Sequence, residues 1–316
     1  MIAQLVMPPR RFVLGAALSL TLLSACSPIV ILNDAVPHST FSETQGLAYG
    51  SDPRQRLDVY VPAGAAIARA MPRPGSGSGS SSDSGSGSGS GSGQRGRPIV
   101  VFFYGGSWQS GERADYLFVG EALASRGFVA VLPDYRTYPQ TVFPGFVDDA
   151  AAAVRWAHDH AQEFGGDPSN LFLMGHSAGA QIAALLATDG QYLAAQRMSK
   201  HDVRGFIGLA GPYDFLPLND ATLERIFPTA LRQASQPINF VAGDEPPMFL
   251  AAGTRDKTVD PGNTDRLAAK LRAADDTVEV KHYSGIDHAL LVGALGAPLR
   301  PLAPVLTDVT QFIDSH

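Results

Sequence analysis

The sequence is poor in cysteine and in charge. Its 316 residues contain one cysteine, and 17% of them are charged. A single cysteine excludes an intramolecular disulfide. The net charge is −6 and no basic stripe runs along the chain, so a nucleic-acid partner is not expected. No metal-ligand cluster and no phosphate-binding loop with a following lysine is present, so neither a metal nor another cofactor is expected.

Long apolar runs are also missing beyond the N-terminal region, which excludes a protein with several membrane spans. At the N-terminus, two arginines precede the apolar run 12–23, whose length suits a signal peptide better than a membrane span. The run ends in Leu-Ser-Ala-Cys, which resembles a bacterial lipobox and implies cleavage before Cys26 and a lipid on its thiol. An ordinary secretory signal with an incidental cysteine is the alternative. We expect residues 1–25 to be a lipoprotein signal peptide and the protein to be anchored in the bacterial cell envelope, at the inner or the outer membrane.

The next part of the chain divides into three stretches. Residues 26–50 are mixed in character and predict a tether with an edge strand. Residues 57–61 alternate apolar and polar, as a half-buried strand does. A Gly/Ser-rich tract at about 72–96 has nothing to bury, so we interpret it as a flexible surface insertion in a domain that runs from 51 to 316.

Most of that domain alternates between two patterns. Short apolar runs predict buried strands, and stretches with helical spacing lie between them. This alternation predicts an α/β fold with a mostly parallel, doubly wound sheet flanked by helices. The strands are expected at 98–103, 128–132, 171–174, 206–210, 248–252 and 277–283, and the helices at 114–125, 146–164, 181–187 and 304–313.

The pentapeptide Gly175-His176-Ser177-Ala178-Gly179 connects one expected strand directly to a helix. A serine on such a sharp turn is strained and has its hydroxyl exposed, and the flanking glycines leave room for close backbone packing. The pattern resembles the nucleophile elbow of the α/β-hydrolases. That resemblance implies the α/β-hydrolase fold, with Ser177 as the nucleophile.

The first long strand is followed by Tyr-Gly-Gly-Ser-Trp, which ends at Trp108. Many α/β-hydrolases have His-Gly-Gly at this position, where the chain has Tyr104. The x-Gly-Gly-x-Trp pattern is similar to bacterial feruloyl-esterase-like carboxylesterases and to kynurenine formamidases. The resemblance implies an oxyanion hole formed by the backbone N–H groups of Gly106, Ser107 and Ala178.

In this fold the catalytic acid follows the nucleophile along the chain. Asp256 lies in a Gly-x-x-Asp loop after the strand 248–252 and is the expected acid. Asp260, in the same loop, is the alternative. Asp244 precedes the strand and so belongs to the wrong edge of the sheet.

The base is expected last. His288 lies in the loop after the strand 277–283, at the edge where ligands of open α/β sheets bind. His282 lies within that strand, and His176 is expected to point away from the serine, either as a packing residue or as one that supports the site residues. A serine hydroxyl needs such a base, oriented by an acid, before it becomes a useful nucleophile.

These residues predict a serine carboxylesterase that forms an acyl-enzyme on a small-molecule ester. An irregular segment at 215–242 is the expected lid, with Trp108, Tyr213 and Phe215 as candidate pocket residues. An arylformamidase, or another amidase, would use the same machinery. A non-catalytic, surface-anchored binding protein on a hydrolase scaffold is the alternative of another class.

Overall fold

The computed structural model describes residues 28–65 and 96–316. The predicted signal peptide, Cys26 and residues 72–95 of the predicted insertion lie outside the described residues. None of the described helices is long and apolar enough to cross a membrane.

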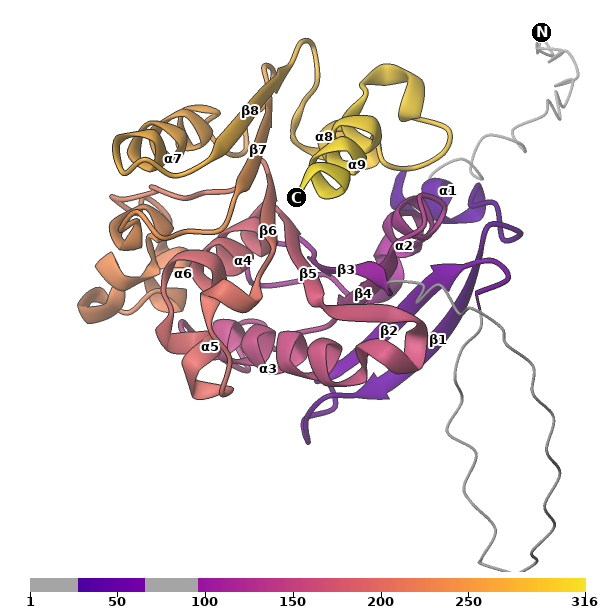
Figure 1. Ribbon diagram of the computed structural model, residues 1–316. Coiled ribbons are helices and arrows are strands. Elements are labelled where there is room, and N and C mark those ends of the chain that lie inside the picture. Colours follow the sequence, from indigo (N-terminus) through magenta and orange to yellow (C-terminus); the bar gives the residue numbers. More distant parts are fainter. Residues whose placement is uncertain (1–27, 66–95) are drawn as a thin grey trace, which may run out of the picture.

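The secondary structure follows the predicted alternation of strands and helices (Figure 1). The strands are β1 (Phe41–Ala48), β2 (Arg56–Pro62), β3 (Arg97–Phe103), β4 (Val129–Pro133), β5 (Gly166–His176), β6 (Gly205–Leu209), β7 (Met248–Gly253) and β8 (Val278–Tyr283). The α-helices are α1 (Pro28–Asp34), α2 (Leu117–Ala124), α3 (Gly145–His160), α4 (Ala178–Thr188), α5 (Gln191–Ala195), α6 (Ala221–Ile226), α7 (Gly262–Ala273), α8 (His288–Gly293) and α9 (Val305–Ser315). Short 3-10 helices are η1 (Arg113–Tyr116), η2 (Ala161–Phe164), η3 (Lys200–Asp202), η4 (Thr229–Leu231), η5 (Gln233–Ser235), η6 (Pro237–Phe240) and η7 (Arg300–Leu302).

The strands form one eight-stranded sheet in the order β1-β2-β4-β3-β5-β6-β7-β8. Strand β2 pairs antiparallel with both β1 and β4, and every pairing from β4 to β8 is parallel. The predicted mostly parallel sheet is therefore confirmed. Parallel strands need crossover connections, and the helices between them cover both faces of the sheet.

The helices form one layer on each face (Figure 1). Helices α3, α4 and α7 lie on one face, and α2, α8 and α9 lie on the other. In the layer of α2, α8 and α9, Phe312 of α9 packs edge-on against Phe172 of β5 and also contacts Phe249 of β7. With both faces covered, the central strands are buried along their whole apolar runs.

Two parts of the N-terminal region differ from the prediction. The stretch 26–50 contains the predicted edge strand, β1, but also helix α1, which was not predicted. Strand β2 is buried on both faces and not half-buried, because its polar residue Asp58 has hydrogen-bond partners that allow its burial. The Asp58 carboxylate accepts hydrogen bonds from Arg113 Nε at 2.8 Å and from the backbone N–H of Gly46 at 2.7 Å.

This burial makes Asp58 a testable structural position. Asp58→Ala leaves the Gly46 N–H and one side of Arg113 without their acceptor, so we expect a loss of about 2 kcal/mol in the free energy of unfolding. Asp159→Ala, which breaks the exposed pair with Arg155, is the control and should cost less than about 0.5 kcal/mol. Urea denaturation measures both, and equal losses would contradict the assignment.

Candidate active site

The predicted site residues follow parallel strands at the edge where those strands end. Ser177 comes directly after β5, and Gly106 and Ser107 follow β3. Asp256 follows β7, and His288 comes after β8 as the first residue of α8. Because parallel strands end at one edge of the sheet, these residues from distant parts of the chain share one rim of the molecule.

Ser177 lies on a strained turn between β5 and α4. Its φ is +56° and its ψ is −125°, a conformation that residues with side chains rarely adopt. Two glycines permit this turn. A Cβ on Gly179 would lie 2.1 Å from the carbonyl oxygen of Phe103, and a Cβ on Gly175 would lie 2.4 Å from the carbonyl oxygen of Gly179. The strain at Ser177 is therefore held in place by backbone packing that no larger residue allows.

His288 and Asp256 form a hydrogen-bonded pair. His288 Nδ1 lies 2.7 Å from Asp256 Oδ2. The other carboxylate oxygen, Oδ1, accepts the backbone N–H groups of Thr258 at 2.8 Å and Val259 at 2.9 Å. A carboxylate only accepts hydrogen bonds, so Nδ1 of the ring carries the proton and Nε2 is the nitrogen that can accept one. This orientation is the one that a general base requires.

The alternative acids lie elsewhere. Asp260 pairs with Arg266 at 3.3 Å, and its pKa is lowered by the backbone N–H of Gly262 and by that guanidinium. Asp244 pairs with Lys200. Neither carboxylate contacts a histidine of the rim. Of the two acids in the loop after β7, Asp256 alone is bonded to His288.

The alternative histidines also differ from His288. His282 projects from β8 and pairs with Asp265 at 2.9 Å on the protein surface. His176 is buried, and its ring centroid lies 4.7 Å from that of His288. Its Nε2 lies 3.0 Å from the backbone carbonyl oxygen of His288, so this nitrogen donates its proton. His176 thereby joins the end of β5, which Ser177 follows, to the first residue of α8.

The predicted oxyanion loop has an unusual backbone. Gly106 has a φ of +137°, and Ser107 and Trp108 have φ values of +52° and +60°. A Cβ on Gly105 would lie 2.9 Å from the Cβ of Ser177, so the loop lies directly against the nucleophile. The backbone N–H groups of Gly106, Ser107 and Ala178 donate no hydrogen bond to the described residues. They remain available to an incoming oxygen.

The hydroxyl of Ser177 forms no hydrogen bond with His288 within the described chain. Ser177 is 8% exposed, so little of this residue is open to solvent at the rim. Such catalytic hydrogen bonds are often long without a substrate and shorten when one binds. The structure thus brings Asp256, His288 and Ser177 to one rim and joins Asp256 to His288 by a hydrogen bond.

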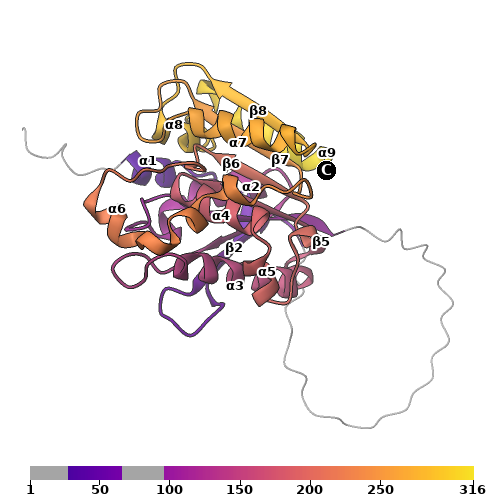
Figure 2. The ribbon, with the colours of Figure 1, turned by 90° about the vertical axis from the view of Figure 1, so that its left-hand side faces the viewer.

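A hollow of about 630 Å³ opens in front of Ser177. Trp108 and Phe215 line it, as predicted, together with residues of the irregular segment around α6, which Figure 2 shows on the same face as α4 and α7. Tyr213 does not line the hollow, and its prediction as a pocket residue is wrong. Its ring is fully buried, because Gly208 and Gly211 lack side chains where the ring packs.

Trp108 connects the hollow to the lid segment. Its ring stacks on Phe215 at 5.6 Å and meets Phe227 edge-on at 4.8 Å. The indole N–H donates to Gln181 Oε1 at 3.0 Å, and the Gln181 amide donates to the backbone oxygen of Ser235 at 2.8 Å. Gln181 was not among the predicted residues. Its only signal in the sequence is a polar residue on an otherwise apolar helix.

Tyr104 occupies the position of the histidine found in many α/β-hydrolases. Its hydroxyl donates to Asp134 Oδ1 at 2.9 Å and accepts from Arg54 Nη2 at 2.8 Å. The same guanidinium donates to the backbone oxygen of Gly111, at the end of the oxyanion loop, at 2.7 Å. Burial raises the pKa of Tyr104, so its hydroxyl stays protonated. The Tyr104 hydroxyl therefore supports the oxyanion loop through Arg54, which donates both to this hydroxyl and to the backbone of Gly111.

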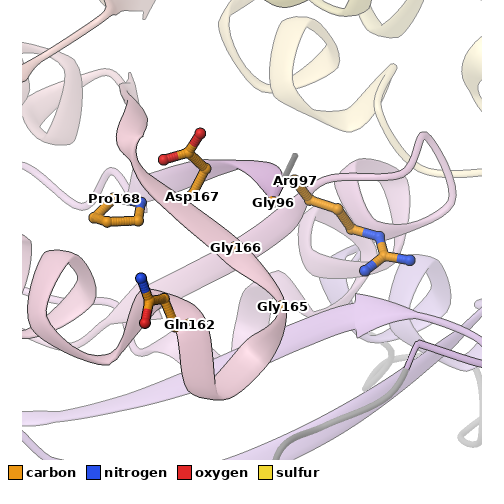
Figure 3. Close-up of a pocket in the computed structure, with 7 residues that line it drawn as sticks. All are labelled: Gly96, Arg97, Gln162, Gly165, Gly166, Asp167 and Pro168. Carbon is orange, nitrogen blue, oxygen red and sulfur yellow. The ribbon is translucent and has the colours of Figure 1, made fainter. Parts of the chain in front are cut away.

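Another hollow, of about 530 Å³, lies at the opposite edge of the sheet (Figure 3). Arg97 and Gly166 begin β3 and β5, and Gln162 and Asp167 lie beside them. The described residues of its lining include no histidine, serine or cysteine. Among residues 28–65 and 96–316, no cluster of three histidine, cysteine or acidic side chains could hold a metal ion. We therefore take the rim at Ser177, and not this hollow, as the candidate active site.

The sheet, its two helical layers and the strained serine turn define an α/β-hydrolase. The BD-FAE family model matches residues 90–271 of the 316-residue chain. The chain belongs to the BD-FAE family.

Curated relatives extend the comparison. The chain is 28% identical over 291 residues to the isoprenylcysteine alpha-carbonyl methylesterase ICME of Arabidopsis thaliana, covering 84% of this chain and 61% of the relative. It is 28% identical over 287 residues to esterase LipC of Mycobacterium tuberculosis, covering 84% and 64%. The chain thus spans less than two thirds of the length of these relatives.

Solved structures show the same fold. A truncated carbohydrate esterase from gut microbiota matches with a TM-score of 0.69 and 19% identity, over 89% of this chain and 98% of that one. Esterase 2 of Thermogutta terrifontis matches with a TM-score of 0.65 and 24% identity, over 87% and 93%. The α/β-hydrolase fold predicted from the sequence is confirmed.

The buried ring of His176 gives a prediction for acid stability. Burial, and the nearby charge of His288, lower the pKa of His176 to about 3. In the unfolded chain an imidazole binds a proton below about pH 6.5, so the unfolded state takes up more protons and stability falls as the pH drops from that value towards 3. His176→Gln keeps an N–H donor and removes this proton. Between pH 7 and pH 5 the unmodified protein should lose about 2 kcal/mol more than the variant.

Urea denaturation at the two pH values measures this difference. All other titrating groups are common to both proteins, so their contributions cancel. Equal losses in the two proteins would contradict a neutral, buried His176.

Proposed function

We propose that this chain is a serine carboxylesterase that hydrolyses small-molecule esters through Ser177, His288 and Asp256. The observation that carries the proposal is the 2.7 Å pair of His288 and Asp256 at the rim where the strained Ser177 lies. The family and the names of the relatives support ester hydrolysis.

In the first half of the reaction, His288 Nε2 takes the proton of the Ser177 hydroxyl as its oxygen attacks the ester carbonyl carbon. Asp256 stays ionised and stabilises the imidazolium that forms. The protonated ring then gives the proton to the alcohol oxygen as the carbon–oxygen bond breaks. The alcohol leaves, and the acyl group remains on Ser177 as an ester.

In the second half, a water molecule takes the place of the alcohol. His288 removes one of its protons, the hydroxide adds to the acyl-enzyme, and the ring returns the proton to Ser177 as the acid is released. The free N–H groups of Gly106, Ser107 and Ala178 stabilise the negative oxygen in both halves. Each such donor typically contributes about 3 kcal/mol to the transition state.

The hollow in front of Ser177 suits the acyl part of the substrate. The oxyanion loop and the lid segment meet there, and Trp108, Phe215 and Leu223 make one side apolar. Because Trp108 belongs to the oxyanion loop and also contacts the lid, a substrate that fills the hollow contacts both.

The first test replaces the nucleophile. Ser177→Ala should lower kcat/KM for p-nitrophenyl esters by at least about 10⁴-fold, because the acyl-enzyme cannot form. The variant should also lose labelling by a fluorophosphonate probe and keep its circular dichroism spectrum. Ser125→Ala, at the distant end of α2, is the control and should behave as the unmodified protein.

Unchanged turnover in Ser177→Ala would reject the nucleophile assignment. Labelling of a folded, unmodified protein that hydrolyses no ester would instead favour an amide or formamide substrate. Absence of both labelling and turnover would favour the binding protein.

We also propose that the mature protein carries a lipid on Cys26 and is anchored in a bacterial cell envelope. The Leu-Ser-Ala-Cys motif supports this proposal. The described chain adds a second argument: α1 begins at Pro28, and its apolar residues Val30 and Ile31 are 43% and 55% exposed. An apolar surface beside the attachment point is compatible with a bilayer.

The anchor is tested by Cys26→Ser in a bacterial host. The unmodified protein should enter the detergent phase of Triton X-114 and incorporate an alkyne-labelled fatty acid, and the variant should do neither. Equal partitioning and labelling of the two proteins would contradict lipidation at Cys26.

A further inference from the structure

The proposed reaction assigns a side of the site to each half of an ester. His288 must give its proton to the departing alcohol oxygen, so the alcohol part has to lie beside the His288 ring. The negative carbonyl oxygen points at Gly106 and Ser107, on the other side of Ser177. A hollow that His288 itself lines is therefore placed to take the alcohol part.

Such a hollow is present. It has a volume of about 680 Å³ and is lined by Arg255, Lys257, Thr258, Asp287, His288 and Ala289. It is separate from the hollow in front of Ser177, and Thr258 lines both. The two hollows thus meet beside the catalytic residues.

From this arrangement we propose that the hollow beside His288 binds the alcohol part of the substrate and selects an alcohol that carries an anionic group, such as a carboxylate, sulfate or phosphate. The inference rests on the proposed esterase function and adds a substrate class to it.

The cations of this hollow are available to a ligand. Arg255 and Lys257 flank the catalytic Asp256, and both are exposed. Within residues 28–65 and 96–316, neither side chain forms an ion pair or a hydrogen bond. Asp256 does not line this hollow and forms no ion pair with either cation; its carboxylate is bonded to His288 Nδ1 and to the backbone N–H groups of Thr258 and Val259.

The remaining carboxylate of this hollow is already engaged. Asp287 Oδ1 accepts the backbone N–H of Leu290 at 2.9 Å and caps the N-terminus of α8. With this carboxylate counted at full charge, the two cations Arg255 and Lys257 still leave the described lining with a formal charge of +1. The hollow beside His288 therefore presents a net positive charge.

The hollow in front of Ser177 has the opposite charge. Among the described residues that line it, the three carboxylates of Asp214, Asp220 and Asp260 outnumber the one cation, Arg266, for a formal charge of −2. Arg266 Nε lies 2.6 Å from Asp214 Oδ2, and its Nη1 lies 3.3 Å from Asp260 Oδ2, so the guanidinium is occupied. An anionic group on the acyl side would meet carboxylates, whereas the same group on the alcohol side meets Arg255 and Lys257. The charges favour one orientation of an anionic ester.

Three acetate esters test the proposal: phenyl acetate, 4-acetoxybenzoate, which is anionic, and 4-acetoxyphenyl-trimethylammonium, which is cationic. For each protein, kcat/KM of a charged ester is divided by kcat/KM of phenyl acetate. Comparing this ratio between proteins removes the intrinsic reactivity of each ester and any general damage to the catalytic residues.

The variants are Lys257→Gln, Arg255→Gln and the double variant. The double variant should lower the ratio for the anionic ester by roughly fivefold, the size expected for solvent-exposed charges. It should raise the ratio for the cationic ester. Lys270→Gln, on the exposed side of α7, is the control and should leave both ratios unchanged. In the unmodified protein, the anionic ratio should fall as salt is added.

Unchanged ratios in the double variant, with phenyl acetate still hydrolysed, would overturn the anion-selective hollow and leave the esterase proposal intact. An unmodified protein that hydrolyses none of the three esters would overturn the esterase proposal, and this inference with it.

Discussion

The close contact between the first turn of α4 and the end of β3 is the constraint on which the site depends. A Cβ at Gly179 would lie 2.1 Å from the Phe103 oxygen and 2.4 Å from the Tyr104 oxygen, both of them backbone atoms that cannot move aside. Any side chain at this position would push α4 away from the sheet. That movement would displace the N–H of Ala178 and relax the strained turn at Ser177. Ser177 and the N–H of Ala178, the proposed nucleophile and one proposed oxyanion donor, are thus positioned by the same backbone contact.

The oxyanion loop depends on a different kind of interaction, a group of buried polar side chains. Tyr104 stacks on Tyr135 at 4.7 Å, and Asp134 accepts its hydroxyl. Asp134 also accepts the backbone N–H of Arg113 at 2.7 Å. Low dielectric strengthens such bonds as long as every member has a partner. Tyr104 in place of the usual histidine is compatible with oxyanion binding, because the proposed donors are backbone N–H groups and not the side chain at this position.

Much of the fold was predictable, since the buried strands are short apolar runs between turns and the helices between them have clear spacing. Ser177, Asp256 and His288 were predicted from their places after the strands β5, β7 and β8, although their catalytic roles stay predictions. Residues whose roles depend on distant contacts were harder to predict. Asp58 is buried only because Arg113, far along the chain, reaches it. Tyr213 follows a strand, where pocket residues are expected. Its ring nevertheless packs in the core, in the space left by Gly208 and Gly211, which have no side chains.

The hydrogen bond from His176 to the backbone of His288 has a consequence for how the chain tolerates change. It joins His288, the proposed base, to the end of β5 from within the protein interior. The connection from α8 to α9 contributes no atom to this hydrogen bond. Changes between residues 296 and 304 act first on the ion pair of Arg300 with the buried Glu121, which joins this connection to α2, and so on stability before the position of His288.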